Sequence, residues 1–404
     1  MSDRVLVVTN DFPPVLGGIE AFAASLTDHL ARDRPPGSVT VLTRAAPLAF
    51  PSPGATGRVR PRSGHSTARP GGCGPEVPYR VVRLPVRTLL PTPATARAVA
   101  QLVRECGAAA VWFPSAAPLG LLASAARRAG ARRVVASTHG HEVWWSRAPG
   151  ARRVLRRIAA EVDSLTFVSA DTGRRIAAAL PPGGAARMTI LRPGVDADRF
   201  APEPMARAEL RERLGVGEAA LVLAVSRLVR RKGVDALLSA WGSVRDTMPG
   251  ARLVVVGDGP DRARISRLTG RLGGERAGIH LVGARPWAEL PRWYAAADLF
   301  ALPVRTRLAG LEPEAFGIAY LEAAASGLPV VGGRSGGTGE AVVDGVTGRL
   351  VTGRDPTAVA AAVTQLLKEP DRGRAWGERG REWVRTERTW QVSGRRLSEL
   401  LRGA

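Results

Sequence analysis

The stretch Ser226-Arg227-Leu228-Val229-Arg230-Arg231-Lys232-Gly233 contains the residues with the clearest chemical signal. The chain has 58 Lys plus Arg, and of these only Lys232 and Lys368 are lysines. An ammonium is a compact point charge with rotatable donors, whereas a guanidinium is a wide planar fork. A lysine at position 232, in a chain that otherwise uses arginine, therefore indicates a buried, short-range contact.

Arg227 and Lys232 lie between a predicted strand and the helix that Gly233 opens. They are thus expected at the carboxyl end of a strand, where open α/β sheets bind their ligands. The proposed role of the two cations is to neutralise a pyrophosphate directly, where other enzymes use Mg²⁺. The alternative is an ordinary solvated basic turn.

A second pair of candidate residues is acidic and consists of Glu314 and Glu322. If Gly317 starts a helix, Glu322 projects about a turn and a half into it, and Glu314 lies in the preceding loop. Two carboxylates near one cleft can accept hydrogen bonds from sugar hydroxyls without holding a metal. The alternative is a pair of solvent-facing glutamates.

The first turn of the chain, residues 10–20, also suits a phosphate. It lies between a predicted strand and a helix, where backbone N–H groups and the helix dipole favour negative charge. Gly17 and Gly18 would allow close backbone approach. The turn lacks G-x-G-x-x-G spacing, so a plain tight turn fits it equally well.

Two histidines, His139 and His141, follow another predicted strand. A histidine at a strand's carboxyl end can place a neutral imidazole beside a substrate, and we assign this role to His139, with His141 second. A structural histidine is the alternative, above all for His141. The run is not H-E-x-x-H, and the D-x-D-like Asp196-Ala197-Asp198 lies in a Pro-Gly connection, so no metal site is predicted.

Apolar runs that alternate with helical stretches must position these residues, and the alternation predicts parallel sheets covered by helices. The pattern restarts after Pro193-Gly194. We therefore predict an α/β fold of two Rossmann-like domains facing a cleft, with a C-terminal helix that crosses back. The predicted domains are 1–193 and 218–375, with a connection at 194–217, a flexible insertion at 46–78 and a helical tail at 376–404. The predicted strands are 5–9, 39–43, 79–84, 109–113, 134–138, 164–168, 221–225, 252–257, 279–282, 299–302 and 329–332.

Composition sets the class of protein. A chain of 404 residues is too long for one ordinary core, and 45% apolar with 23% charged residues is typical of a soluble globular protein. No signal-peptide layout and no apolar run long enough to span a bilayer are present in the sequence. Cys73 and Cys106 suggest neither a disulfide framework nor a metal pair. We expect a cytoplasmic protein.

The formal net charge of +22 suits an anionic partner such as a nucleic acid. Most of the positive excess falls in residues 1–193, which indicates an anionic surface or ligand for that half. A nucleic-acid-binding protein would leave the two cations and two carboxylates above unexplained. No nucleic-acid partner is therefore predicted.

Together these motifs resemble the retaining glycosyltransferases of the GT-B fold, a large family that includes sucrose synthases and bacterial mannosyltransferases. The resemblance implies that Arg227 and Lys232 grip a nucleotide diphosphate, Glu322 holds the ribose hydroxyls and Glu314 contacts the donor sugar. Lys232 would then be a phosphate ligand that an arginine would misplace. The motifs that carry the resemblance are Ser226-Arg227-Leu228 with Lys232-Gly233, Val256-Gly257-Asp258-Gly259-Pro260, Glu314 with Glu322, and Ala325-Ser326-Gly327-Leu328-Pro329-Val330-Val331.

The resemblance runs from Arg4 to about Val384, apart from 46–78, and implies a nucleotide-sugar donor with no metal needed to bind it. Its expected catalytic residues are His139, Arg227, Lys232 and Glu314. Its expected donor-binding residues are Gly17, Gly18, Arg227, Lys232, Gly257, Val282, Glu314, Phe316, Gly317 and Glu322.

A narrower set of motifs is similar to the actinobacterial phosphatidylinositol monomannoside mannosyltransferases. That family moves α-mannose from GDP-mannose to the inositol 6-position, so the resemblance implies this donor and a lipid-linked acceptor. The chain has Glu314-Ala315 where the family usually has Glu-Gly, and its 46–78 insertion lies in the acceptor-binding half. The alternative is the same fold with another nucleotide sugar or another acceptor, such as a polysaccharide or a natural product. The shared motifs are Asn10-Asp11-Phe12-Pro13-Pro14, Leu89-Leu90-Pro91-Thr92-Pro93, Thr138-His139-Gly140-His141-Glu142 and Arg305-Thr306-Arg307-Leu308-Ala309-Gly310-Leu311.

A lipid acceptor requires docking on a membrane, and the basic amphipathic segment 147–161 suits an anionic one. We therefore expect a protein that is peripheral on the inner face of the cell membrane. The alternative is an ordinary helix with a solvated arginine face. The expected docking residues are Arg152, Arg153, Arg156 and Arg157.

Overall fold

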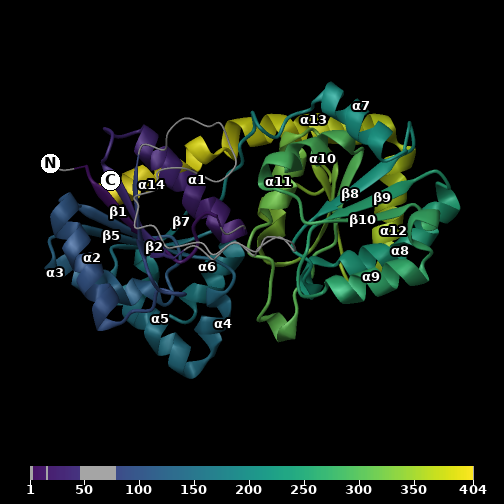
Figure 1. Ribbon diagram of the computed structural model, residues 1–404. Coiled ribbons are helices and arrows are strands. Elements are labelled where there is room, and N and C mark those ends of the chain that lie inside the picture. The colour runs from purple at the N-terminus through teal and green to yellow at the C-terminus, as the bar shows by residue number, and fades with distance from the viewer. Residues whose placement is uncertain (1–2, 15–16, 46–78, 404) are drawn as a thin grey trace, which may run out of the picture. The chain divides into compact units, whose positions relative to one another are not determined.

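The chain divides into two compact units, each built on one parallel sheet (Figure 1). The computed structural model describes residues 3–14, 17–45 and 79–403. The first unit comprises Met1–Phe167, Gly173–Leu191 and Ser393–Ala404, and the second comprises Val168–Thr172 and Arg192–Val392. The predicted insertion at 46–78 lies outside the described residues.

The first unit contains a seven-stranded sheet of order β3-β2-β1-β4-β5-β6-β7. Every pairing is parallel, and Val5 of β1 lies opposite Val39 of β2 and Ala110 of β4. The strand order therefore reverses between β1 and β4, which is the point where open α/β sheets bind ligands. The strands are β1 (Val5–Val8), β2 (Val39–Arg44), β3 (Arg80–Leu84), β4 (Ala110–Phe113), β5 (Arg133–Thr138), β6 (Ser164–Phe167) and β7 (Met188–Ile190).

Helices cover this sheet because local signals start and stop them between apolar strands. For example, the Thr92 hydroxyl accepts from the backbone N–H of Thr95, Pro93 occupies the first turn, and Gly107 ends the helix in the left-handed region. The fully buried Leu6, Val8 and Val111 lie at the centre of the core. The helices are α1 (Gly18–Arg32), α2 (Pro93–Cys106), α3 (Ala123–Arg128), α4 (Glu142–Arg147), α5 (Pro149–Glu161) and α6 (Ala170–Ala177).

The C-terminal helix α14 (Trp390–Arg402) returns to the first unit. A Cβ at Gly394 would lie 2.0 Å from the His29 ring on α1, so only glycine allows this close approach. The Arg34 guanidinium donates to the Ser398 hydroxyl at 3.2 Å. The predicted return of the C-terminal helix is confirmed, although the predicted tail is two helices, α13 (Pro370–Glu387) and α14, separated at Arg388 and Thr389.

The second unit contains a six-stranded parallel sheet of order β10-β9-β8-β11-β12-β13. Its order reverses between β8 and β11, so the loops that follow these two strands meet at the switch point. The strands are β8 (Leu221–Val225), β9 (Arg252–Val256), β10 (Ile279–Gly283), β11 (Leu299–Leu302), β12 (Val330–Gly333) and β13 (Gly348–Val351). Its other helices are α7 (Pro204–Arg213), α8 (Val234–Thr247), α9 (Arg262–Arg271), α10 (Leu290–Ala296), α11 (Ile318–Ala325) and α12 (Pro356–Lys368).

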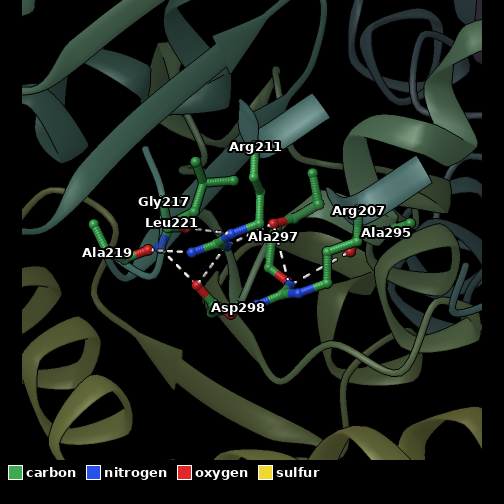
Figure 2. Close-up of polar contacts among 9 residues, drawn as sticks. Arg207, Arg211, Gly217, Ala219, Leu221, Ala295, Ala297 and Asp298 are labelled. Atoms are coloured by element: carbon green, nitrogen blue, oxygen red, sulfur yellow. Dashed lines mark hydrogen bonds and ion pairs between the residues drawn. The ribbon is translucent and has the colours of Figure 1, made fainter. Parts of the chain in front are cut away.

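One carboxylate, Asp298, ties α7 to the start of β8 and β11 (Figure 2). It accepts from Arg207 at 2.5 Å, from Arg211 at 3.2 Å and from the backbone N–H of Leu221 at 2.8 Å. Arg211 is buried and also donates to the Ala219 carbonyl at 2.5 Å. The amino-terminal edge of the sheet is thereby fixed, away from the end that carries the candidate site.

The predicted pair of Rossmann-like units is confirmed, and each predicted strand occurs within a residue or two. Two edge strands, β7 and β13, were not predicted. The first has three half-buried residues, and the second begins with glycine and an exposed arginine, so neither forms a clear apolar run. No described helix combines the length and apolarity that crossing a membrane requires.

Candidate active site

The switch point of the second unit brings Lys232 and Glu314 together. Lys232 follows β8 and Glu314 follows β11, and the Lys232 ammonium lies 2.7 Å from a carboxylate oxygen of Glu314. Gly233 makes this approach possible, because its φ is 74° and a Cβ there would lie 1.9 Å from the Pro303 carbonyl. Lys232 thus makes a short-range contact, here with a protein carboxylate, and its role as a phosphate ligand stays a prediction.

Glu314 is buried among cations. Burial alone would raise its pKa, but Lys232 and then Arg231, whose Nε lies 3.9 Å away, hold the pKa of Glu314 below its ordinary value. Its backbone N–H donates to the Ser335 hydroxyl at 3.1 Å, which fixes the loop. The carboxylate is therefore ionised and rigidly held.

Glu322 projects from α11, and the hydroxyl of Tyr294 on α10 donates to it at 2.7 Å. Burial raises the pKa of Glu322 to about 7, and the Tyr294 hydrogen bond and the positive charge of Lys232 oppose that rise. Burial raises the pKa of Tyr294 well above its ordinary value, and the charge of Glu322 adds to this rise. Lys232 thus acts electrostatically on both predicted carboxylates, Glu314 and Glu322.

Gly317 precedes α11, as predicted, and places Glu322 inside the helix and Glu314 in the loop. Its φ is 101°, and a Cβ there would lie 2.5 Å from the Tyr320 ring. The Phe316 side chain is buried and packs in the core, and a donor-binding role for Phe316 stays a prediction. The N–H groups of a first helical turn suit a phosphate.

Arg227 is exposed at the end of β8, and the described residues give its side chain no polar partner. Its loop lies against the loop after β9, because the Leu228 N–H donates to the Asp258 carbonyl at 2.8 Å. A Cβ at Gly257 would lie 1.9 Å from the Ser226 carbonyl, which explains the glycine. Val282 is half-buried on β10, next to Gly283, whose carbonyl accepts from the Gly257 N–H at 2.9 Å.

In the first unit, His139 and His141 follow β5 and differ in environment. Burial lowers the pKa of His139, and its Nε2 donates to the Pro114 carbonyl at 2.7 Å. Because a carbonyl only accepts, the neutral ring carries its proton on Nε2 and keeps a lone pair on Nδ1. His139 can therefore accept a hydrogen bond from a hydroxyl, as a neutral imidazole.

His141 is paired with Glu142, a fully buried carboxylate 3.1 Å from its Nε2. Burial would lower the pKa of His141, but the Glu142 charge and hydrogen bond raise it above its ordinary value. Glu142 also accepts from the backbone N–H of His139 at 2.7 Å. Asp11 follows β1 and lies near both histidines. Burial raises the pKa of Asp11, and the charges of His141 and His139 oppose that rise. The pair at 141 and 142 thus holds the loop that presents His139.

The predicted phosphate turn in the first unit, residues 10–20, is described except for Val15 and Leu16. Gly18 begins α1, and a Cβ there would meet nothing within 4 Å. A Cβ at Gly17 would lie 2.3 Å from a carboxylate oxygen of Glu20. A phosphate-binding role for Gly17 and Gly18 stays a prediction.

The predicted docking arginines on α5 have several protein contacts. The Nε atoms of Arg152 and Arg156 both donate to the Ala179 carbonyl, at 3.2 and 2.7 Å. Arg157 pairs with Glu161 at 3.1 Å, and Arg153 is exposed. Their membrane role stays a prediction.

Sequence reasoning missed Tyr294, Arg231, Asp11 and Glu142 as members of these clusters. Asp11 and Glu142 stand in motifs that the sequence does show, and their positions after β1 and before α4 were the available signal. Tyr294 had no such signal, because it reaches Glu322 from a different helix. Within the described ranges, no group of three or more His, Cys, Asp or Glu is arranged to hold a metal ion.

Comparisons with known proteins match both halves of the chain to families. Residues 206–383 match the family described as "Glycosyl transferases group 1", and residues 16–199 match "Glycosyltransferase Family 4". A protein of Mycolicibacterium smegmatis named GDP-mannose-dependent alpha-(1-6)-phosphatidylinositol monomannoside mannosyltransferase is 46% identical over 99% of this chain and 98% of its own length. The monoacylated-acceptor mannosyltransferase of Corynebacterium glutamicum is 39% identical over the same shares of the two chains.

Solved structures resemble the chain over its whole length. Anabaena HepE in complex with UDP has a TM-score of 0.75 at 21% identity, covering 99% of this chain and 100% of that one. The sucrose-phosphate synthase of Thermosynechococcus elongatus has a TM-score of 0.75 at 22% identity, covering 99% and 98%. At these identities the likeness concerns the fold, and it agrees with two Rossmann-like domains.

Proposed function

The chain belongs to the family of GDP-mannose-dependent phosphatidylinositol monomannoside mannosyltransferases, with the GT-B fold, and we propose that it transfers α-mannose from GDP-mannose to the inositol 6-position of phosphatidylinositol monomannoside with retention of configuration. The observation that carries the proposal is the ion pair between Lys232 and Glu314, with Glu322 close by, at the switch point of the second unit. In a nucleotide sugar, a diphosphate lies between two sugars. A cation between two carboxylates suits this donor, because the cation can bind the diphosphate and each carboxylate can bind the hydroxyls of one sugar.

The donor is held as follows. Arg227 and Lys232 neutralise the diphosphate, and the N–H groups at the start of α11 add further donors. The ionised Glu314 accepts hydrogen bonds from the mannose hydroxyls, and Glu322 accepts from the ribose hydroxyls. Because Lys232 pairs with Glu314 in this structure, the donor inserts its phosphate beside a cation that is already oriented.

The transfer needs no enzymic nucleophile. The bond between the anomeric carbon and the β-phosphate oxygen breaks, and the acceptor hydroxyl forms its bond to the same face. The departing β-phosphate takes the acceptor proton, so GDP leaves and the α configuration is kept. Catalysis then consists of positioning and of stabilising the charge on the leaving phosphate.

We assign the acceptor to the first unit, where the excess positive charge of the chain concentrates. The lone pair on Nδ1 of His139 accepts a hydrogen bond from a sugar hydroxyl, and the His141–Glu142 pair holds its loop. A phosphate-binding role for Gly17 and Gly18 is part of this proposal. A lipid acceptor places the enzyme on the inner face of the cell membrane, as a peripheral protein.

A polysaccharide or natural product is the second candidate acceptor, because this chain has Ala315 where the family usually has a glycine beside the donor sugar. The experiment incubates the protein and GDP-mannose with phosphatidylinositol monomannoside, with phosphatidylinositol and with a soluble mannoside. The proposal predicts a dimannosylated lipid with an α-1,6 linkage from the first acceptor. Equal transfer to the soluble mannoside would favour a polysaccharide or natural-product acceptor.

A further inference from the structure

Arg305 and Thr306 follow β11, in a motif that the proposed donor contacts do not use. They are half-buried, and they are the first polar residues after the strand. Arg305 contacts the turn after β8, which carries Lys232, and Thr306 contacts a residue that holds the loop of Glu314. Two neighbouring residues therefore reach the surroundings of both partners of the ion pair.

Arg305 binds the turn that carries Lys232 through its backbone and through its side chain. Its backbone N–H donates to the Arg231 carbonyl at 2.8 Å. Its guanidinium donates to the carboxylate of Asp235, in the first turn of α8, at 2.7 Å. One residue thus contacts the chain on both sides of Lys232, and it fixes the backbone from which the ammonium extends.

A second guanidinium fixes Asp235. Arg264 on α9 donates to the same carboxylate oxygen at 3.1 Å, and its Nε donates to Asp261 at 2.8 Å. Burial would raise the pKa of Asp235, but the hydrogen bonds and charges of Arg305 and Arg264 lower it below its ordinary value. Asp235 is therefore ionised and oriented, and it gives Arg305 a rigid anchor.

Thr306 supports the other partner of the ion pair through a single hydroxyl. The hydroxyls of Thr306 and Ser335 share a hydrogen bond of 2.8 Å, and the Ser335 hydroxyl accepts from the backbone N–H of Glu314 at 3.1 Å. Ser335 and Glu314 are both buried, which strengthens these bonds. The chain returns from Thr306 to Glu314 through a loop that is closed where the backbones of Arg307 and Glu312 exchange hydrogen bonds of 3.1 and 3.2 Å.

We infer that Arg305 and Thr306 are positioning residues for the donor site, with Arg305 setting the place of Lys232 and Thr306 setting that of Glu314. The inference rests on the proposed function, which assigns Lys232 to the diphosphate and Glu314 to the donor sugar. Arg305 should therefore matter for every ligand that carries a diphosphate, and Thr306 only for a ligand that also carries the sugar. A general loss of stability would not distinguish these two ligands.

The test measures the affinity of the full chain for GDP and for GDP-mannose by isothermal titration calorimetry. Arg305→Met keeps much of the length of the side chain and removes the guanidinium. It should weaken both ligands about tenfold, because a small displacement of the cation costs much of its contact with the diphosphate. Thr306→Val keeps the shape and removes the hydroxyl. It should weaken GDP-mannose about fivefold, the effect of one neutral hydrogen bond, and leave GDP affinity within about twofold of wild type.

The matched control is Arg207→Met, which makes the same chemical change at the amino-terminal edge of the same sheet. The Arg207 guanidinium pairs with Asp298 at 2.5 Å, so this variant also loses an Arg–Asp pair. It should leave both affinities within about twofold of wild type. Equal weakening in Arg207→Met and Arg305→Met would overturn the inference, because lost stability alone would then explain it. A Thr306→Val variant that weakened GDP as much as GDP-mannose would also overturn it.

A double-mutant cycle tests whether Arg305 acts through Asp235. Asp235→Asn should weaken GDP as Arg305→Met does. The double variant should bind GDP within about twofold of the weaker single variant, because both changes remove the same contact. Fully additive losses would contradict the positioning role of Arg305.

These affinities do not depend on the acceptor, so the inference and the proposed function fail separately. If wild type bound both ligands but transferred no mannose to phosphatidylinositol monomannoside, the proposed function would fail. The inference would then stand on the expected pattern of affinities in Arg305→Met and Thr306→Val.

Discussion

The hydroxyl of Tyr294 donates a hydrogen bond of 2.7 Å to the carboxylate of Glu322 and thereby fixes the group that we assign to the ribose. Tyr294 is fully buried, and its ring stacks on Phe300 and meets Phe200 edge-on, both at 5.5 Å between centroids. The aromatic packing therefore orients the hydroxyl, and the hydroxyl orients the carboxylate.

The first prediction concerns Tyr294→Phe and pH. The pKa of Glu322 is about 7, and the Tyr294 hydrogen bond opposes its rise. Ribose hydroxyls bind the ionised carboxylate, so GDP affinity should increase as pH rises through about 7. Removing the hydroxyl should move this midpoint upward by about one pH unit, since a hydrogen bond to a charged group is worth about 1.5–3 kcal/mol.

The measurement is a titration of GDP affinity from pH 6 to 9 in wild type and variant. Ionisation of GDP itself is common to both proteins, so the difference reports Glu322. Tyr320→Phe is the control, because that buried hydroxyl donates to the Leu302 carbonyl at 2.6 Å. A midpoint that does not move in Tyr294→Phe would contradict the positioning role.

The second prediction uses the two lysines of the chain. Lys232→Arg should lower turnover by about 10²–10³, because a wide guanidinium misplaces the charge on the leaving phosphate. Lys368→Arg, at the exposed end of α12, should leave turnover unchanged. Steady-state kinetics with GDP-mannose checks both. Wild-type turnover in Lys232→Arg would show that only net charge matters there.

The third prediction is the stability cost of breaking the buried pair. Glu314→Ala leaves Lys232 without its carboxylate partner and should lower the free energy of unfolding by about 3 kcal/mol. The pKa of Glu314 is lowered in the folded protein, so its contribution is present above the unfolded pKa and is lost only as pH falls through the folded value. The cost should therefore be constant between pH 8 and 6.

Urea unfolding at several pH values checks this cost. Glu312→Ala is the matched control, since its pair with Arg307 at 2.9 Å is partly exposed and should be worth at most about 1 kcal/mol. Equal costs in the two variants would argue that the pair of Lys232 and Glu314 is effectively solvated.

The fourth prediction separates the two histidines. His139→Ala should lower turnover by about 10² while GDP affinity stays, because we assign its lone pair to a sugar hydroxyl. His141→Gln should instead change stability. The pKa of His141 is raised by Glu142, so its contribution is fully present below the unfolded pKa and is lost as pH rises through the folded value. Wild type should lose this increment above neutral pH, and the variant should not.

Melting temperatures measured from pH 5 to 9 follow the His141 effect, and single-turnover kinetics follow His139. If His141→Gln lost turnover at wild-type stability while His139→Ala retained it, the assignment of the two roles would be reversed.

Most of the candidate donor site could be predicted because parallel sheets impose their own geometry. Lys232 and Glu314 stand 82 positions apart, yet each follows a strand at the point where the strand order reverses, so their contact follows from topology. Gly317 marked the start of α11 and so placed Glu322 one and a half turns into the helix.

The parts that escaped prediction depend on side-chain packing between elements. Tyr294 reaches Glu322 from α10, and no spacing in the sequence records which face of that short helix meets α11. The basic pattern of 147–161 likewise did not reveal that Arg152 and Arg156 both donate to one carbonyl after α6. Periodicity gives the exposed face of a helix, and only the packed structure gives its neighbours.

The most direct test of the account is a thermal-shift titration of the protein with GDP, UDP and ADP, with and without EDTA. A nucleotide that binds the folded state raises the melting temperature as its concentration passes the dissociation constant. We expect GDP to stabilise the protein most, EDTA to leave this stabilisation unchanged, and Lys232→Ala to remove it. A clear preference for UDP would contradict GDP-mannose as the donor, and no shift with any nucleotide would contradict the donor site itself.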